Sequence, residues 1–221
     1  MKPEFREILS EVAHLFRPNP WHGVKTWADK SETDLNSYIE IVPTDRVKYE
    51  IDKETGYLKV DRPQKFSNII PALYGLIPRT YSAEKSAKYT MEQTGRDGLF
   101  GDADPIDICV LTEKSISHGD ILVNCVPIGG FRMLDGGEVD DKIVAVLKDD
   151  AIYGHMKDIN ECPEPILDKL KHYFLTYKQI PEEGMKAKIE ITGLYGREEA
   201  LRIIELGEED YNDKFGDNFV F

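Results

Sequence analysis

The segment GDADPIDICVL, residues 101–111, constrains the fold more than any other part of this sequence. Its three aspartates lie within six residues and lead directly into an apolar stretch that predicts a β-strand. Carboxylates this close repel one another, and binding a hard divalent cation is the least costly way to keep all of them ionised. A solvated acidic turn is the simpler alternative. Asp107 weakens that alternative, because it shares strand parity with Cys109 and Leu111 and is expected at the wall of a sheet.

A second acidic segment, DGGEVDDK at residues 135–142, separates two further apolar stretches that are predicted as strands. Acidic clusters at strand ends can meet in space although they are far apart in the chain. Such a meeting would create a site for several metal ions. A plain hairpin turn is the alternative for this segment, since Asp and Gly are common in turns.

The spacing of apolar residues predicts strands in the middle of the chain and helices at its ends. Period-two alternation predicts strands over 38–42, 47–51, 57–62, 106–111, 121–126, 131–134, 142–146 and 186–194. Three- and four-residue spacing predicts helices over 2–17, 164–178 and 197–206. Because strands and helices do not alternate regularly, the expected class is α+β, with a small antiparallel β-barrel flanked by helices.

The organisation along the chain indicates a single domain over residues 1–221. Residues 1–36 are predicted to form an N-terminal arm, and the polar stretch 80–100 an inserted loop or lobe. The longest apolar stretch, 69–78, contains two prolines and is too short to span a bilayer. Charged residues interrupt residues 1–16, so no signal-peptide core is found there. We therefore expect no membrane partner.

The balance of charge excludes further partners. Lys and Arg number 28 against 41 for Asp and Glu, which gives a net charge of −13. Such a field repels a nucleic-acid duplex or an anionic membrane at long range. The three cysteines, Cys109, Cys125 and Cys162, form no CxxC pair, which argues against a disulfide framework or a zinc knuckle. The sequence therefore predicts a soluble cytoplasmic protein.

Basic and aromatic side chains near the predicted strand ends favour an anion as the ligand. Arg62 shares strand parity with Val60 and is expected on an apolar face, where a guanidinium needs an anionic partner. Lys48 lies in a neighbouring strand, and Tyr177 and Lys178 end a helix. Solvated or helix-capping lysines are the alternatives. Beside carboxylates that hold Mg²⁺, these groups could cradle a multiply charged phosphate and stabilise its transition state.

Taken together, these segments resemble the family I soluble inorganic pyrophosphatases. The chain follows that family's order and spacing in five segments: YIEIVPTDRVKYEIDKETGYLKVDR (38–62), IPALYG (70–75), GDADPIDICVL (101–111), VPIGGFRMLDGGEVDDKIVAV (126–146) and HYFLTYK (172–178). The resemblance implies a five-stranded antiparallel barrel of the oligonucleotide-binding type, flanked by helices. It also implies hydrolysis of inorganic pyrophosphate to two orthophosphates, by water that several Mg²⁺ ions activate.

The resemblance further implies roles for individual residues. The implied metal ligands are Asp102, Asp107, Asp135 and Asp140, with Glu40 and Glu50 as outer ligands through water. The implied phosphate-binding residues are Lys48, Arg62, Tyr74, Lys142, Tyr177 and Lys178. Asp104 matches the carboxylate beside the nucleophilic water. One departure is Ile70, at a position where the family often has a tyrosine.

The resemblance leaves assembly and substrate range open. A homo-oligomer is expected, either a hexamer, as is usual in bacterial members, or a dimer, as in eukaryotic ones. The N-terminal arm, the 80–100 loop and the tail after Lys178 are longer than in compact bacterial members. Two other functions stay open: a Mg²⁺-dependent phosphohydrolase acting on nucleotides or polyphosphate, and a noncatalytic barrel that binds single-stranded nucleic acid. The acidic charge argues against the second.

Overall fold

The computed structural model describes residues 17–31, 33–178 and 188–216. The helix predicted over 2–17 lies almost wholly outside this part of the chain, as does the start of the strand predicted over 186–194. None of the helices in the described part is long and apolar enough to cross a membrane.

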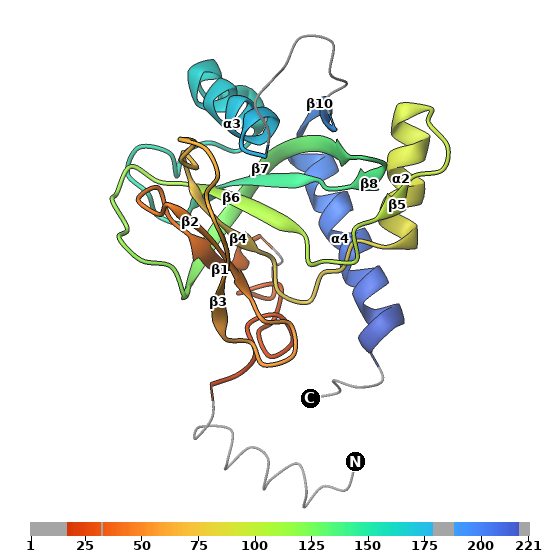
Figure 1. The fold of residues 1–221 in the computed structure, drawn as a ribbon, viewed down its shortest axis with the longest axis horizontal. Helices are drawn as coiled ribbons and strands as arrows, with labels where there is room; N and C mark the ends of the chain where they lie inside the picture. Colours follow the sequence, from red (N-terminus) through yellow and green to blue (C-terminus); the bar gives the residue numbers. More distant parts are fainter. Residues whose placement is uncertain (1–16, 32, 179–187, 217–221) are drawn as a thin grey trace, which may run out of the picture.

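Five strands form a closed ring in which each strand is hydrogen-bonded to two neighbours (Figure 1). In ring order they are β1 (Leu35–Ile41), β4 (Leu73–Leu76), β6 (Asp107–Leu111), β9 (Lys142–Leu147) and β7 (Ile121–Asp135), which pairs again with β1. All of these pairs are antiparallel except β6–β9, which is parallel. The prediction of a purely antiparallel sheet is wrong for this pair, because the chain reverses twice between β6 and β9.

Strand β7 is 15 residues long, although the sequence predicts two shorter strands here. Pro127 and Gly129 interrupt the alternation of side chains, but the strand stays continuous and shifts its register with β9 between them. Glycine is required at the shift, because a Cβ on Gly129 would lie 2.3 Å from the Tyr195 carbonyl oxygen. Besides β1 and β9, β7 pairs with β10 (Ile189–Gly196) and β8 (Glu138–Val139). It therefore connects most of the sheet.

Strands β2 (Val47–Ile51) and β3 (Leu58–Pro63) form a separate two-stranded sheet beside the ring. A turn joins them, with Gly56 in the left-handed region at φ 75°. Most of β3 is exposed, including Val60 at 54%. The expectation that Arg62 lies on an apolar face is therefore wrong, because this face of the hairpin is open to solvent.

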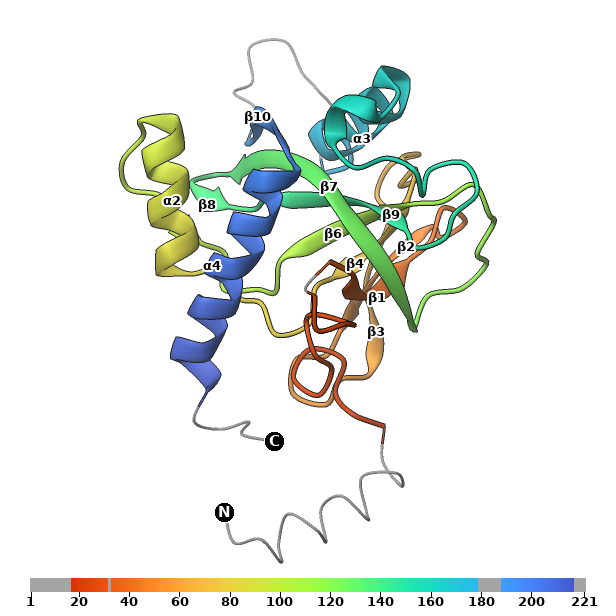
Figure 2. The same cartoon turned by 180° about the vertical axis from the view of Figure 1, so that it is seen from behind.

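Helices α3 (Glu164–Thr176) and α4 (Arg197–Phe215) pack against different parts of the ring (Figures 1 and 2). Phe174 of α3 and Ile204 of α4 belong to two hydrophobic clusters, each of which takes alternate residues of β6 and β9. This division follows from the strands, whose successive side chains point to opposite faces. Helix α4 continues beyond its predicted end at residue 206, because its buried stripe extends to Tyr211.

Helix α2 (Glu84–Thr94) occupies much of the stretch 80–100, so the prediction of a loop is wrong for these residues. The side chains that α2 buries are small or polar: Ser86, Ala87 and Thr90. The Asp210 carboxylate of α4 caps the helix start by accepting three backbone N–H hydrogen bonds, each of 3.1 Å, from Ala83, Lys85 and Ser86. A cap from so distant a residue leaves no local sequence signal. The chain returns through β5 (Phe100–Gly101), which pairs with β8.

Replacing Asp158 by alanine should lower the free energy of unfolding at pH 7 by about 1 kcal/mol. The Asp158 carboxylate accepts a 2.8 Å hydrogen bond from the Arg197 N–H at the start of α4. It also accepts one from the Asn160 N–H in the 3₁₀ turn Ile159–Glu161. These bonds lower the pKa of Asp158. Its contribution is therefore present above the unfolded-state pKa and is lost as the pH falls through the folded-state value.

Urea unfolding of both proteins measures this contribution. The difference in unfolding free energy between the unchanged protein and Asp158→Ala should have its full value at pH 7 and should shrink below about pH 4. Asp168→Ala, which removes an exposed aspartate of α3, serves as the control and should change stability little. A loss of stability in Asp158→Ala that is the same at every pH would contradict this role of the ionised Asp158 carboxylate.

Candidate active site

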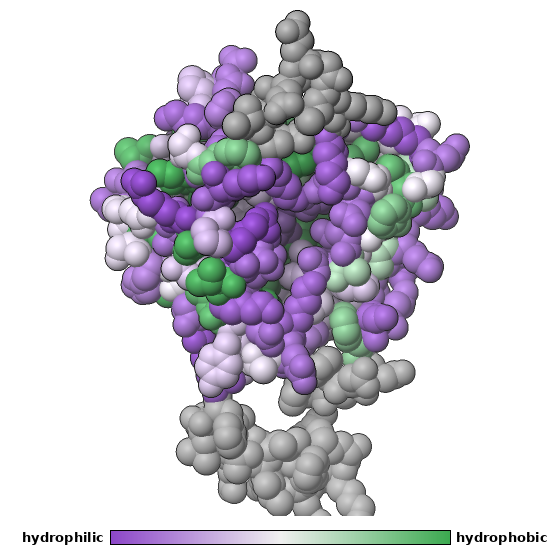
Figure 3. Space-filling model, in the orientation of Figure 1, coloured by the Kyte–Doolittle hydropathy of each residue, from purple (hydrophilic) through white to green (hydrophobic). Residues whose placement is uncertain are grey.

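A cavity of about 180 Å³ opens where β6 and β9 begin. The face of the molecule in Figure 3 is mainly hydrophilic and is hollowed near its middle. Arg62 does not line the cavity. The other predicted site residues all do: Glu40, Lys48, Glu50, Tyr74, Asp102, Asp104, Asp107, Asp135, Asp140, Lys142, Tyr177 and Lys178. The fold therefore gathers segments that are far apart in the sequence around one space.

Asp107 and Lys142 begin the paired strands β6 and β9 and lie opposite each other in the register. The Lys142 ammonium, whose side chain is 1% exposed, donates to the carboxylates of both Asp107 and Asp140. Tyr74 on β4 donates its hydroxyl to Asp107 at 2.5 Å. The parallel pairing of β6 with β9 thus joins the two acidic segments.

Burial makes the ionised forms in this cluster unfavourable. Desolvation raises the pKa of Asp102 to about 8, and the nearby charge of Asp140 adds to this effect. Burial also raises the pKa of Asp140, against the opposing charge of Lys142. Burial alone would lower the pKa of Lys142, but Asp107 and Asp140 raise it well above its usual value. Further positive charge in the cavity would stabilise the ionised carboxylates.

Two lysines hold the Asp135 carboxylate at the end of β7. Lys178, which follows α3, lies 2.5 Å from Oδ2, and Lys188, which precedes β10, lies 3.1 Å from Oδ1. Burial alone would raise the pKa of Asp135, but hydrogen bonds from the two lysines hold it below its usual value. Asp135 is therefore ionised at neutral pH. Sequence reasoning missed Lys188, which lies outside the recognised segments.

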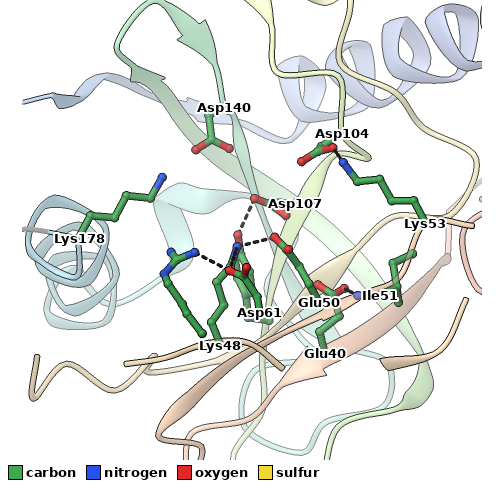
Figure 4. A network of polar contacts seen from close by, with 12 residues as sticks. Glu40, Lys48, Glu50, Ile51, Lys53, Asp61, Asp104, Asp107, Asp140 and Lys178 are labelled. Atoms are coloured by element: carbon green, nitrogen blue, oxygen red, sulfur yellow. Dashed lines mark hydrogen bonds and ion pairs between the residues drawn. The ribbon is translucent and has the colours of Figure 1, made fainter. Parts of the chain in front are cut away.

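Lys48 and Glu50 lie on the same face of β2, as the alternation predicts, with Nζ 2.5 Å from Oε1. Lys48 also lies 3.6 Å from Asp61 on β3, and Arg62 pairs with the same carboxylate (Figure 4). The Arg62 side chain is 44% exposed. Asp61, which the sequence analysis did not single out, thus connects Arg62 to the cavity through Lys48.

Glu40 connects the ring to the hairpin. Its carboxylate, on β1, accepts a 2.7 Å hydrogen bond from the Ile51 N–H at the end of β2 (Figure 4). Burial raises the pKa of Glu40 to about 8, and the charges of Asp107 and Glu50 add to the shift. Glu40 therefore orders the hairpin as well as lining the cavity.

Asp104 differs from the other aspartates of its segment, because its side chain is 39% exposed and pairs with Lys53 (Figure 4). Lys53 lies in the turn between β2 and β3 and lines the cavity. The Asp104 N–H donates to the Asp102 carboxylate at 3.1 Å. The Asp102 carboxylate is thus held by the backbone of its own turn, whereas the Asp104 carboxylate pairs with Lys53. Sequence reasoning missed Lys53, since a lysine in a turn is usually solvated.

Aromatic side chains border the cavity beside α3. The ring of Tyr177 stacks on Tyr173 with 5.0 Å between centroids, and Phe174 lies between Tyr177 and Tyr74. Burial raises the pKa of Tyr177 to about 12, so its hydroxyl remains a donor at neutral pH. Ile70 is 2% exposed and packs in the same hydrophobic cluster. This position therefore contributes packing where the family often has a hydroxyl.

The donors of the cavity suit a hard divalent cation. Its lining offers carboxylate oxygens and, among the residues that the structure describes, contains no cysteine or histidine. Oxygen is the ligand atom that Mg²⁺ and Ca²⁺ prefer. Within residues 17–31, 33–178 and 188–216, no three Asp, Glu, His or Cys side chains already converge closely enough to hold an ion. The residues fit such a cation through their chemistry and through the excess of buried negative charge.

Comparison with known proteins decides the family. A sequence model described as inorganic pyrophosphatase matches residues 37–212. The chain belongs to the inorganic pyrophosphatase family. The resemblance found in the motifs is therefore confirmed, and this pyrophosphatase hydrolyses inorganic pyrophosphate.

Relatives match the pyrophosphatase along most of its length. The inorganic pyrophosphatase of Chlamydia caviae is 55% identical over 210 residues, which cover 94% of this chain and 97% of the relative. That of Picrophilus torridus is 32% identical over 191 residues, covering 86% and 94%. A crystal structure of inorganic pyrophosphatase from Thermus thermophilus is 27% identical, with a TM-score of 0.71 over 88% of this chain and 99% of that one.

Proposed function

We propose that this pyrophosphatase depends on Mg²⁺ ions, which Asp102, Asp107, Asp135 and Asp140 would hold. The observation that carries the proposal is the meeting of two acidic segments around one cavity that is also lined by lysines. Glu40 and Glu50 would act as outer ligands through water. When bound, the cations would lower the pKa of a coordinated water and neutralise the charge of the substrate.

The chain's own residues would bind the phosphates and move the proton. Lysines and tyrosines around the cavity would bind the phosphate oxygens: Lys48, Tyr74, Lys142, Tyr177 and Lys178. Arg62, which is joined to Lys48 through Asp61, would bind them as well. Asp104, whose side chain is 39% exposed, would accept a proton from the attacking water. Lys178 would stabilise the leaving phosphate, and it already lies beside the ionised Asp135.

A phosphate-release assay with pyrophosphate, tripolyphosphate and ATP tests this proposal. With Mg²⁺, turnover of pyrophosphate should greatly exceed that of the other two, and with a chelator all turnover should stop. Turnover that persists after chelation would refute the metal dependence. Comparable turnover of ATP would favour the broader phosphohydrolase.

Arg62→Lys should lower kcat/KM by about 10-fold or more, because a guanidinium grips phosphate bidentately and an ammonium provides only a point charge. Steady-state kinetics measures the loss. Tyr177→Phe should lose less, about 0.5–1.5 kcal/mol for one hydrogen bond. Arg46→Lys, at an exposed arginine that does not line the cavity, is the matched control. Unchanged kcat and KM in Arg62→Lys would make Arg62 structural.

We also propose that the ring of five strands is a barrel of the oligonucleotide-binding type, and that the protein is a cytoplasmic homo-oligomer, either a hexamer or a dimer. The closed strand order supports the barrel. The cysteines, all three buried and free, support a reducing compartment. Sedimentation equilibrium would distinguish a hexamer from a dimer, and a monomer at micromolar concentration would contradict both.

A further inference from the structure

The insertion that carries α2 begins and ends at the same place in the fold, because Ser82 before the helix and Gly101 after it lie side by side. Gly101 packs so closely here that a Cβ on it would lie 2.2 Å from the Ser82 carbonyl oxygen. Ser82 itself is 7% exposed and does not line the main cavity. Any effect of Ser82 on the reaction must therefore pass through its neighbours.

Ser82 holds the first acidic segment through its backbone. Its N–H donates to the Asp104 carbonyl at 2.9 Å, and its carbonyl accepts from the Ala103 N–H at 3.1 Å. Ala103 has φ 63°, in the left-handed region that non-glycine residues seldom adopt. The two hydrogen bonds thus maintain the tight turn from which Asp102 and Asp104 diverge.

The Ser82 hydroxyl reaches the second acidic segment. It donates to the carbonyl of Val139, the residue before Asp140, at 3.2 Å, and Ser82 lines one small cavity together with Asp102 and Asp140. Pairing of β5 with β8 brings Gly101 opposite Val139 at the same place. The remaining space around these groups is a cavity of about 10 Å³.

Helix α4 fixes Ser82 from the other side. The Tyr81 N–H donates to the Gly207 carbonyl at 3.0 Å, and the Ala83 N–H donates to the Asp210 carboxylate at 3.1 Å. Both neighbours of Ser82 are thus tied to one helix.

We propose that Ser82 is a positioning residue for pyrophosphate hydrolysis, which sets the separation between Asp102 and Asp140. The contacts described above join the turn that carries Asp102 to the strand end that precedes Asp140. This inference rests on the proposed role of the two aspartates as metal ligands. It adds to that role a side chain that does not line the main cavity and acts through the geometry of the ligands.

Calorimetric titration of Mg²⁺ into the substrate-free Ser82→Ala enzyme tests the inference. The dissociation constant for Mg²⁺ should rise by about 10-fold or more, because groups that orient metal ligands typically contribute 10- to 100-fold to affinity. At saturating Mg²⁺, kcat should return to within a few-fold of the unchanged enzyme.

Ser86→Ala is the matched control, because Ser86 is equally buried at 6% and its hydroxyl donates to Asp210 at 3.0 Å. It should lower the melting temperature without changing Mg²⁺ affinity. Equal affinities in the two alanine variants would overturn the role of Ser82. Asp107→Asn separates this outcome from failure of the metal site. If that variant also binds Mg²⁺ normally, the site is misassigned and both proposals fall; if it loses binding, only the role of Ser82 falls.

Discussion

Replacing Asp107 by asparagine should lower pyrophosphate turnover by more than about 10²-fold. Asp107 lies at the start of β6, where its carboxylate accepts hydrogen bonds from Lys142 and Tyr74. An amide oxygen can still accept from Tyr74, so the local packing should survive. The amide lacks the charge and the ligand strength that a divalent cation requires. Phosphate release at saturating Mg²⁺ measures the loss, with a thermal melt to establish that the variant is folded.

Glu40→Gln is the comparison variant. Its amide oxygen can keep the hydrogen bond from the Ile51 N–H, and Glu40 is proposed as an outer ligand only. Its loss of turnover should therefore be clearly smaller than that of Asp107→Asn. Equal losses in the two variants at saturating Mg²⁺ would contradict the assignment of Asp107 as a principal ligand.

Asp104→Asn should lower kcat by about 10²–10⁴-fold, the usual contribution of a general base, while Mg²⁺ affinity stays within a few-fold of the unchanged enzyme. The structure separates Asp104 from its neighbours, because it faces Lys53 and solvent rather than the Lys142 cluster. The acidic limb of the pH–rate profile should also move, since this residue no longer accepts the proton. A pH–rate series and calorimetric titration of Mg²⁺ measure the two effects.

Asp102→Asn should behave in the opposite way. Asp102 lies beside Asp140, whose charge helps to raise its pKa, so its substitution should weaken Mg²⁺ binding first. A collapse of Mg²⁺ binding in Asp104→Asn, with kcat restored at high Mg²⁺, would make Asp104 a ligand and remove it as the base.

The aspartates that line the cavity could be found from the sequence because they are concentrated in two short segments next to apolar strands. The predicted strand over 47–51 likewise implies that Lys48 and Glu50 share one face, as they do on β2. In these cases the local pattern is sufficient, since the direction of a side chain follows from its place in the strand.

Arg62 shows where such reasoning fails. Parity with Val60 predicts its direction, but the register of β3 against β2 shifts at this point, so that Arg62 lies opposite Lys48 while Val60 lies opposite Tyr49. Whether a face of β3 is covered depends, in addition, on where the hairpin lies against the ring. Helix α2 was missed for a related reason, because its cap is Asp210 and its packing partner is α4, both far along the chain. Lys53 and Asp61 enter the site through the same hairpin, and nothing in their local sequence marks them.

The many pairings of β7 imply that different walls of the active site open on different timescales. Amides in the middle of β7 are bonded to partners on both sides, so they should exchange with deuterium only when the whole molecule unfolds. The hairpin of β2 and β3 has no third strand, and its amides should exchange through local opening. We therefore expect the part of the site that carries Asp107 and Asp135 to open slowly and the hairpin that carries Lys48 and Arg62 to open fast.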